Sequence, residues 1–138
     1  MMGLDRFLDA QKDSYEIALK EIKAGRKRSH WMWYIFPQIA GLGYSSTAQY
    51  YAIMDLDEAI EYMNHPVLGK RLVEITEALL QVDSNDAEQV LGYPDHLKLK
   101  SSMTLFYLAS GNDVFKKVLD KFFEGKMDQK TVHILQNR

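Results

Sequence analysis

The stretch that decides the fold class lies between residues 65 and 80, and it reads His65-Pro66-Val67-Leu68-Gly69-Lys70-Arg71-Leu72-Val73-Glu74-Ile75-Thr76-Glu77-Ala78-Leu79-Leu80. Its large apolar residues recur every three or four positions, the spacing that places them on one face of an α-helix. His65 before Pro66 is typical of a helix start, because proline fits the first helical position and the residue before it can act as a cap. The stretch therefore predicts an amphipathic helix with one buried face.

The same spacing extends over almost the whole chain, and no segment alternates as a half-buried strand would. A long helix is expected from about residue 4 to residue 24, and a short one from residue 30 to residue 36. Further helices are expected after Ser45 or Ser46, after Asp55, before Gly92, from Pro94 to Gly111, before Gly125 and after Asp128. We predict a single all-α domain over residues 1–138, with about seven to nine short helices around two buried central helices, 68–80 and 97–108.

Composition narrows the class of protein. The 138 residues are 46% hydrophobic and 26% charged, which is ordinary for a globular domain. The net charge of −2 argues against a surface built wholly for nucleic acid. The lack of cysteine excludes disulfides, thiol catalysis and thiolate metal sites. Since no apolar stretch has the length of a signal peptide or a membrane span, we expect a cytoplasmic protein that does not bind membranes.

The first place to look for a function is the segment Arg26-Lys27-Arg28-Ser29-His30-Trp31-Met32-Trp33-Tyr34-Ile35-Phe36-Pro37-Gln38, which holds both tryptophans. Guanidinium groups match phosphate or carboxylate oxygens in pairs, and aromatic rings can stack a flat ligand. The alternative interpretation is that the rings belong to the core and the cations simply remain in water.

A second candidate region begins at Lys98, on a helix whose opposite face is apolar. Serines in the middle of such a helix indicate either close helix packing or hydroxyls with partners. If this helix lies beside the first segment, the two regions form one anion-sized pocket. Our first hypothesis is therefore a site for a small anionic, phosphate-bearing ligand, lined by Arg26, Arg28, His30, Trp33, Gln38, Lys98, Ser101 and Ser102.

Two other functions stay open. A non-catalytic interaction module would bind a protein partner through exposed aromatic rings near residues 31–36. Weak, sequence-independent binding of nucleic acid is the third hypothesis, which the net charge of −2 disfavours. The sequence contains no nucleophile elbow and no phosphate-binding loop, and its four histidines lack metal-ligand spacing. It therefore gives no basis for an enzyme, a metal or a cofactor.

Several strings of residues resemble a known family. They are Ser29 to Gln38, Gly41-Leu42-Gly43, His65-Pro66-Val67-Leu68-Gly69 and the run from Lys98 to Phe106. On these strings the chain resembles the bacterial domain-of-unknown-function 1810 family over about residues 4–135. The resemblance implies a multihelical fold and no assigned activity. It also implies an arginine where this chain has Lys100, and lysine keeps the charge there but loses the paired donors.

Members of that family are sometimes labelled calpastatin, an inhibitor of calpain. An extended inhibitor that folds on its target is poor in aromatic and large apolar residues. This chain is 12% aromatic and is predicted to form packed helices throughout. Its composition therefore contradicts the label.

Overall fold

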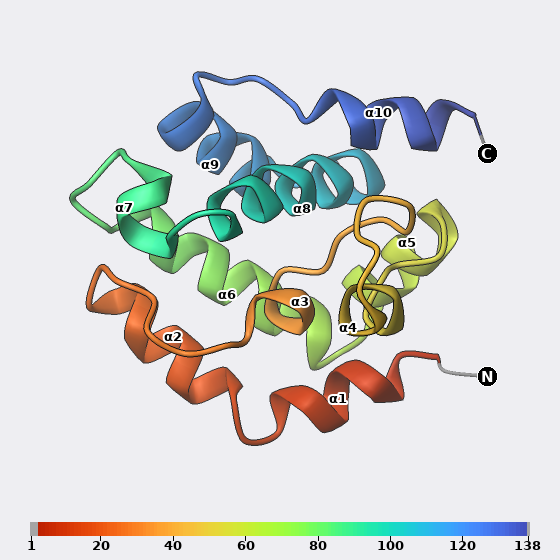
Figure 1. The fold of residues 1–138 in the computed structure, drawn as a ribbon, viewed down its shortest axis with the longest axis horizontal. Coiled ribbons are helices and arrows are strands. Elements are labelled where there is room, and N and C mark those ends of the chain that lie inside the picture. The colour runs from red at the N-terminus through yellow and green to blue at the C-terminus, as the bar shows by residue number, and fades with distance from the viewer. Residues whose placement is uncertain (1–2, 138) are drawn as a thin grey trace.

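The computed structural model describes residues 3–137, and short turns join ten α-helices within them (Figure 1). In chain order these are α1 (Asp5–Gln11), α2 (Tyr15–Lys23), α3 (Met32–Ile35), α4 (Ser46–Tyr50), α5 (Leu56–Asn64), α6 (Leu68–Leu80), α7 (Ala87–Leu91), α8 (Asp95–Ser110), α9 (Asp113–Phe123) and α10 (Gln129–Gln136). The described residues hold no strand, only an isolated bridge between Ile39 and Ile53. The all-α prediction is confirmed. None of the described helices has the length and apolarity needed to cross a membrane.

Helix starts use the side chains that the sequence indicates. The carboxylate of Asp55 caps α5 by accepting a hydrogen bond from the Glu58 amide at 2.8 Å. Before α6, the Nδ1 atom of His65 accepts from the amides of Val67 and Leu68 at 3.1 and 3.2 Å. These bonds satisfy amides that have no partner inside the helix, so the local sequence fixes where each helix begins.

The long helix expected from residue 4 to residue 24 is instead two helices, α1 and α2, separated by a turn at residues 12–14. This break raises the number of described helices to ten, above the seven to nine predicted. Asp13 and Ser14 favour turns, because their side chains compete for backbone hydrogen bonds. The turn lets Gln11 of α1 donate to the Tyr62 hydroxyl at 3.0 Å, while α2 packs along α6.

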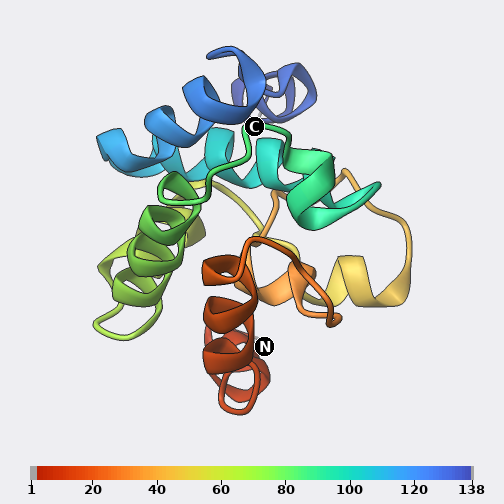
Figure 2. The same ribbon diagram turned by 90° about the vertical axis from the view of Figure 1, so that its left-hand side faces the viewer.

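The two helices predicted to be central are both largely buried. α8 has six consecutive buried residues, Ser101 to Phe106, and packs against α5, α7, α9 and α10. α6 packs against α2, α5 and α9. α5 and α9 therefore connect the two central helices, with α1 and α2 on one side of the molecule and α10 on the other (Figures 1 and 2).

The contact between α5 and α6 depends on a glycine. A Cβ atom at Gly69 would lie 2.1 Å from the carbonyl oxygen of Met63 and 2.8 Å from its carbonyl carbon. Both are backbone atoms, so no side-chain movement could relieve the overlap. Only glycine allows α6 to start this close to the end of α5.

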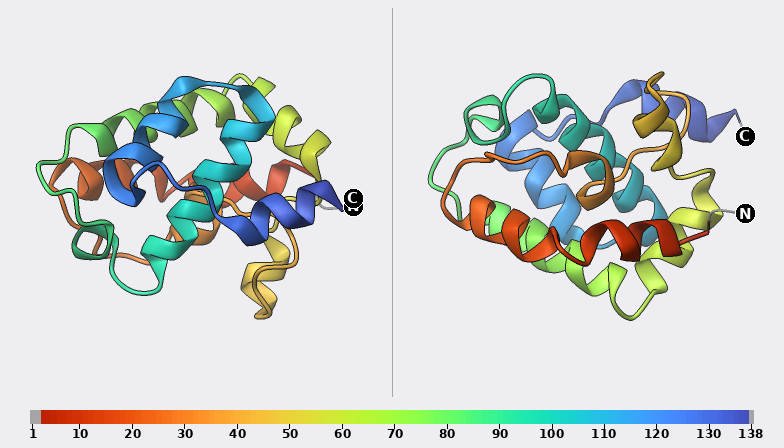
Figure 3. Two further views of the ribbon diagram at one scale, coloured as in Figure 1. Left: turned by 90° about the horizontal axis from the view of Figure 1, so that it is seen from above. Right: turned by 60° about the horizontal axis from the view of Figure 1, so that its bottom comes forward.

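The segment between residues 38 and 53 leaves the helical body and returns to it, carrying α4 at its tip (Figure 3). Its two ends are tied together, because the Ile53 amide donates to the Gln38 carbonyl and the Ala40 amide donates to the Ile53 carbonyl, each at 2.8 Å. This tie holds the segment beside the aromatic stretch and forms one wall of the candidate site.

Candidate functional site

The donors of the basic–aromatic segment converge on a carboxylate of the protein itself. Glu21, on α2, accepts hydrogen bonds from the backbone amides of Arg28 and Ser29 at 2.8 and 3.0 Å. The Ser29 hydroxyl donates to the same carboxylate at 2.6 Å, and the indole Nε1 of Trp31 donates to it at 2.9 Å. Much of the hydrogen-bonding capacity that the sequence suggests for an external anion is therefore used inside the fold.

This arrangement changes the acidity of Glu21. Partial burial works against the charged form, but the hydrogen bonds from Ser29, Arg28 and Trp31 outweigh it and lower the pKa of Glu21 from 4.5 to about 2. The side chain therefore stays charged over the physiological range and anchors residues 28–31 to α2.

The second feature of the site is a group of charges between the segment and α8. Asp95 binds two lysines: its Oδ2 lies 2.9 Å from the Lys27 Nζ, and its Oδ1 lies 3.1 Å from the Lys98 Nζ. Burial opposes the charge on Asp95, yet the two lysines hold the pKa of that carboxyl below its usual value. The Lys98 Nζ also lies 4.8 Å from the centre of the Trp33 ring, within range of a cation–π contact.

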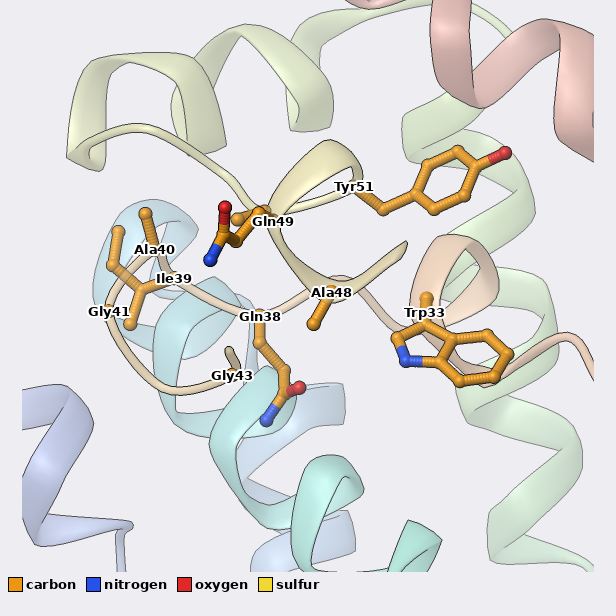
Figure 4. A pocket seen from close by; sticks show the side chains of 10 residues that line it. Trp33, Gln38, Ile39, Ala40, Gly41, Gly43, Ala48, Gln49 and Tyr51 are labelled. Atoms are coloured by element: carbon orange, nitrogen blue, oxygen red, sulfur yellow. The ribbon is translucent and has the colours of Figure 1, made fainter. Parts of the chain in front are cut away.

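A cavity of about 80 Å³ lies next to Trp33. In Figure 4 the indole of Trp33 and the side chain of Gln38 border this space, and α4 borders it through Ala48. The side chain of Gln38 is partly exposed, and its carboxamide has no hydrogen-bond partner within the described residues, so it can still donate and accept. We call this space the Trp33–Gln38 cavity; it is lined by Trp33, Gln38, Ile39, Ala40, Gly41, Gly43, Ala48, Gln49, Tyr51 and Ala52.

Three basic residues predicted for the site, Arg26, Arg28 and His30, lie elsewhere or are exposed. Arg26 lines a separate groove of about 580 Å³ with Lys23 and residues 81–84, 88 and 89. Arg28 and His30 are exposed, and neither lines the Trp33–Gln38 cavity. The structure thus places Trp33 and Gln38 in one cavity and Lys98 against the Trp33 ring, outside the cavity lining, and it gives Arg26, Arg28 and His30 other surroundings.

Ser101 and Ser102 in the middle of α8 are both buried, and Ser101 has a structural partner. The Ser101 hydroxyl lies 3.0 Å from the Asp128 carboxylate and 3.3 Å from the carbonyl of Leu97, one turn back. The Ser102 hydroxyl is fully buried and has no hydrogen-bond partner within the described residues. Neither serine lines the Trp33–Gln38 cavity. The bond to Asp128 accounts for Ser101, whereas Ser102 fits the close-packing interpretation.

Two of the four aromatic rings of the segment, Trp31 and Phe36, are core, so the alternative interpretation is right for half of them. Trp31 is 1% exposed, and its ring centre lies 6.2 Å from that of Phe36, which is also buried. Trp33 and Tyr34 remain partly exposed. An interaction module built on exposed rings at residues 31–36 would thus have only these two rings available.

Sequence reasoning did not identify Glu21 or Asp95 as members of the site. A carboxylate on one helix that binds a segment ten residues later leaves no periodic signal. Asp95 carried a weak signal, since it precedes Lys98 by three positions on a helix, a spacing at which opposite charges meet. Within residues 3–137 no three histidine or acidic side chains are grouped so that they could hold a metal ion.

Comparisons with known proteins agree with this structure. The family model described as "Protein of unknown function (DUF1810)" matches residues 1–135. A search of curated proteins finds no match. Among solved structures, the chain is similar to the crystal structure of the conserved hypothetical protein Rv1873 from Mycobacterium tuberculosis, with 46% sequence identity, a TM-score of 0.94 and 96% of each chain covered. Because the family model spans nearly the whole chain, the protein belongs to the DUF1810 family of unknown function, as the sequence resemblance predicted.

Proposed function

We propose that the protein binds a small anionic ligand, one that carries a phosphate or a carboxylate, in the Trp33–Gln38 cavity, with Lys98 supplying the positive charge. One observation carries the proposal: the ammonium of Lys98 lies 4.8 Å from the ring of Trp33, which itself lines the cavity. Lys98 does not itself line the cavity, but it lies against the ring of Trp33, so a cation borders a space that holds a flat apolar surface and a carboxamide. Binding sites usually combine these elements.

The charges around Lys98 support an anionic ligand. Asp95 is shared between Lys27 and Lys98, so the three side chains carry one positive charge in excess. The side chain of Lys98 is 23% exposed, which leaves its ammonium accessible to a ligand while part of its hydration is already lost. Partial desolvation strengthens the attraction between this ammonium and an anion.

The size of the cavity limits what enters it. A cavity needs about 10–15 Å³ of accessible space to hold one water molecule, and this cavity has about 80 Å³. It can accept a single phosphate, a carboxylate or a small polar group, whereas a whole nucleotide would extend beyond it. In a larger ligand, the remainder would lie against the partly exposed side chain of Trp33.

The test is titration of the full chain with inorganic phosphate, acetate and adenosine monophosphate, followed by calorimetry and by tryptophan fluorescence. We expect at least one of these anions to bind and Lys98→Ala to weaken it roughly ten- to a hundredfold, the usual effect of losing a charged hydrogen bond. Lys70→Ala, which removes an exposed lysine on α6, is the matched control and should leave affinity unchanged.

A second variant should change the anion affinity in the opposite direction. Asp95→Asn removes the carboxylate that competes for Lys98, so it should tighten anion binding about fivefold. A ligand whose affinity is unchanged in both Lys98→Ala and Asp95→Asn binds elsewhere, and that result would contradict the proposal. If an oligonucleotide binds and its affinity falls steeply as salt is added, that result would instead support the nucleic-acid hypothesis.

A further inference from the structure

A different face of the molecule combines exposed apolar side chains with carboxylates. Met54, before α5, is 54% exposed, while Leu56 and Ile60 on α5 are 38% and 37% exposed. Leu56 and Ile60 are four positions apart, so they lie on the same side of α5. Asp57 and Glu61 follow them by one position and share the same spacing, which sets a row of carboxylates beside the apolar row.

Two grooves adjoin along this face. One, of about 390 Å³, is lined by Gly3, Arg6, Met54, Asp55, Asp57, Glu58 and Glu61. The other, of about 550 Å³, is lined by Ala40, Met54, Asp55, Leu56, Asp57 and Leu135. Because both grooves share Met54, Asp55 and Asp57, they form one band that runs from the start of α1 across α5 to the end of α10. We call this band the α5 face.

The charge of the α5 face is strongly one-sided. Four carboxylates line it, and the only cation that lines it within the described residues is Arg6. Arg6 is buried and fixed: its guanidinium donates to the carbonyls of Tyr50 and Ala52 at 2.8 and 2.7 Å and pairs with Glu58 at 3.0 Å. It therefore neutralises Glu58. Asp57 and Glu61 have no cation beside them among the residues that line the band, and Asp55, whose carboxylate caps α5, pairs with none there either.

We propose that the α5 face is a docking surface for a protein segment that is both basic and apolar, such as an amphipathic helix with lysines or arginines beside its apolar stripe. The apolar side chains at positions 54, 56 and 60 would contact that stripe, and the carboxylates at 55, 57 and 61 would meet its cations. Neither feature alone selects this partner: a purely apolar segment leaves the carboxylates unpaired, and a purely basic one leaves the apolar row in water.

The experiment uses the full chain and a defined probe. The probe is a labelled 18-residue peptide of leucine and lysine with leucine at helical spacing, and binding is followed by fluorescence anisotropy. A lysine peptide of the same charge but with alanine in place of leucine is the comparison probe. We expect saturable binding of the leucine–lysine peptide and at least tenfold weaker binding of the alanine–lysine peptide.

Two double variants of the protein locate the surface. Each should weaken binding of the leucine–lysine peptide at least tenfold. One variant combines Asp57→Lys with Glu61→Lys, and the other combines Leu56→Ser with Ile60→Ser. The matched control, Asp13→Lys with Glu77→Lys, makes the same change in net charge at two other exposed carboxylates and should change affinity less than twofold. Circular dichroism checks that each variant keeps its helices, and if the serine variant unfolds, the lysine variant alone decides the test.

Four results would overturn the proposal. The first three are that the leucine–lysine peptide shows no saturable binding, that the two peptides bind equally, and that the control variant weakens binding as much as the test variants do. The fourth is that sedimentation shows a dimer of this chain and that the Asp57→Lys, Glu61→Lys variant is a monomer. The last result would assign the α5 face to a second copy. None of these outcomes depends on whether the Trp33–Gln38 cavity binds an anion.

Discussion

At the scale of the residue, Glu21 determines how the basic–aromatic segment is presented. Its carboxylate accepts hydrogen bonds from two backbone amides, a hydroxyl and an indole N–H within residues 28–31. These donors fix the path of the chain between α2 and Trp33, while the side chains of Arg28 and His30 stay in solvent. The sequence shows a cluster of cations, but the stabilising charge in the fold is an anion from the preceding helix.

The lowered pKa of Glu21 predicts how stability changes with pH. A carboxyl group whose pKa falls from 4.5 to about 2 on folding stabilises the folded state fully above pH 4.5, and this contribution is lost as the pH falls through 2. Because Glu21 is partly exposed, solvent screens its interactions, and the contribution is about 1–2 kcal/mol. Glu21→Gln should therefore lower the free energy of unfolding at pH 7 and flatten its decline between pH 5 and pH 2.

Urea denaturation at several pH values measures this effect. Glu77→Gln, at an exposed position on α6, is the control and should follow the wild-type curve. If the Glu21→Gln and wild-type curves run parallel from pH 5 to pH 2, the carboxylate does not hold the segment in the way described.

At the scale of the element, hydrogen bonds of Asp128 link the start of α10 to α8. Asp128 caps α10 by accepting from the Thr131 amide at 3.2 Å and its hydroxyl at 2.6 Å, and it accepts from the Ser101 hydroxyl of α8 at 3.0 Å. Its own amide donates to the Thr104 hydroxyl at 2.9 Å. A short helix such as α10 is marginal by itself, so its position depends on these bonds together with the packing of Ile134 and Leu135 against the core.

Asp128→Ala should cost about 2 kcal/mol, because it removes an N-cap and a charge-assisted bond to Ser101. Hydrogen exchange should accelerate in the amides of α10 far more than in those of α8. Asp128→Asn keeps a good capping side chain and should recover about half of the loss. Uniform acceleration over all helices would mean that Asp128 acts on global stability alone.

Helix starts could be predicted from the sequence where a nearby side chain caps the helix. Asp55, Asp128 and His65 mark helix starts in the sequence, and each accepts the expected backbone bonds in the structure. The break between α1 and α2 was not predicted, since residues 4–24 keep one helical pattern and the turn depends on where α5 and α6 lie. For the same reason Lys98 could be placed beside Trp33 only conditionally, and Ser101 could not be assigned to Asp128.

At the scale of the whole molecule, one cluster of buried apolar residues joins the helices. It includes residues of α1, α2, α3 and α5 through α9, and Ile134 and Leu135 of α10 pack against it. We therefore expect the chain to unfold in one cooperative transition, as a single domain does. Ellipticity at helical wavelengths and tryptophan fluorescence should give coincident denaturation curves, and two separated transitions would contradict the single-domain prediction.

The close approach at Gly69 also bears on how the family is recognised across genomes. Residues 65–69 contribute one of the strings by which the chain resembles its family, and there His65 caps α6 while Gly69 leaves room for the Met63 carbonyl. We therefore expect His65 and Gly69 to be retained in any homologue that keeps the α5–α6 junction, whatever ligand or partner that homologue binds. A match at this string therefore indicates that a relative has the same α5–α6 junction, and by itself it gives no information about what that relative binds.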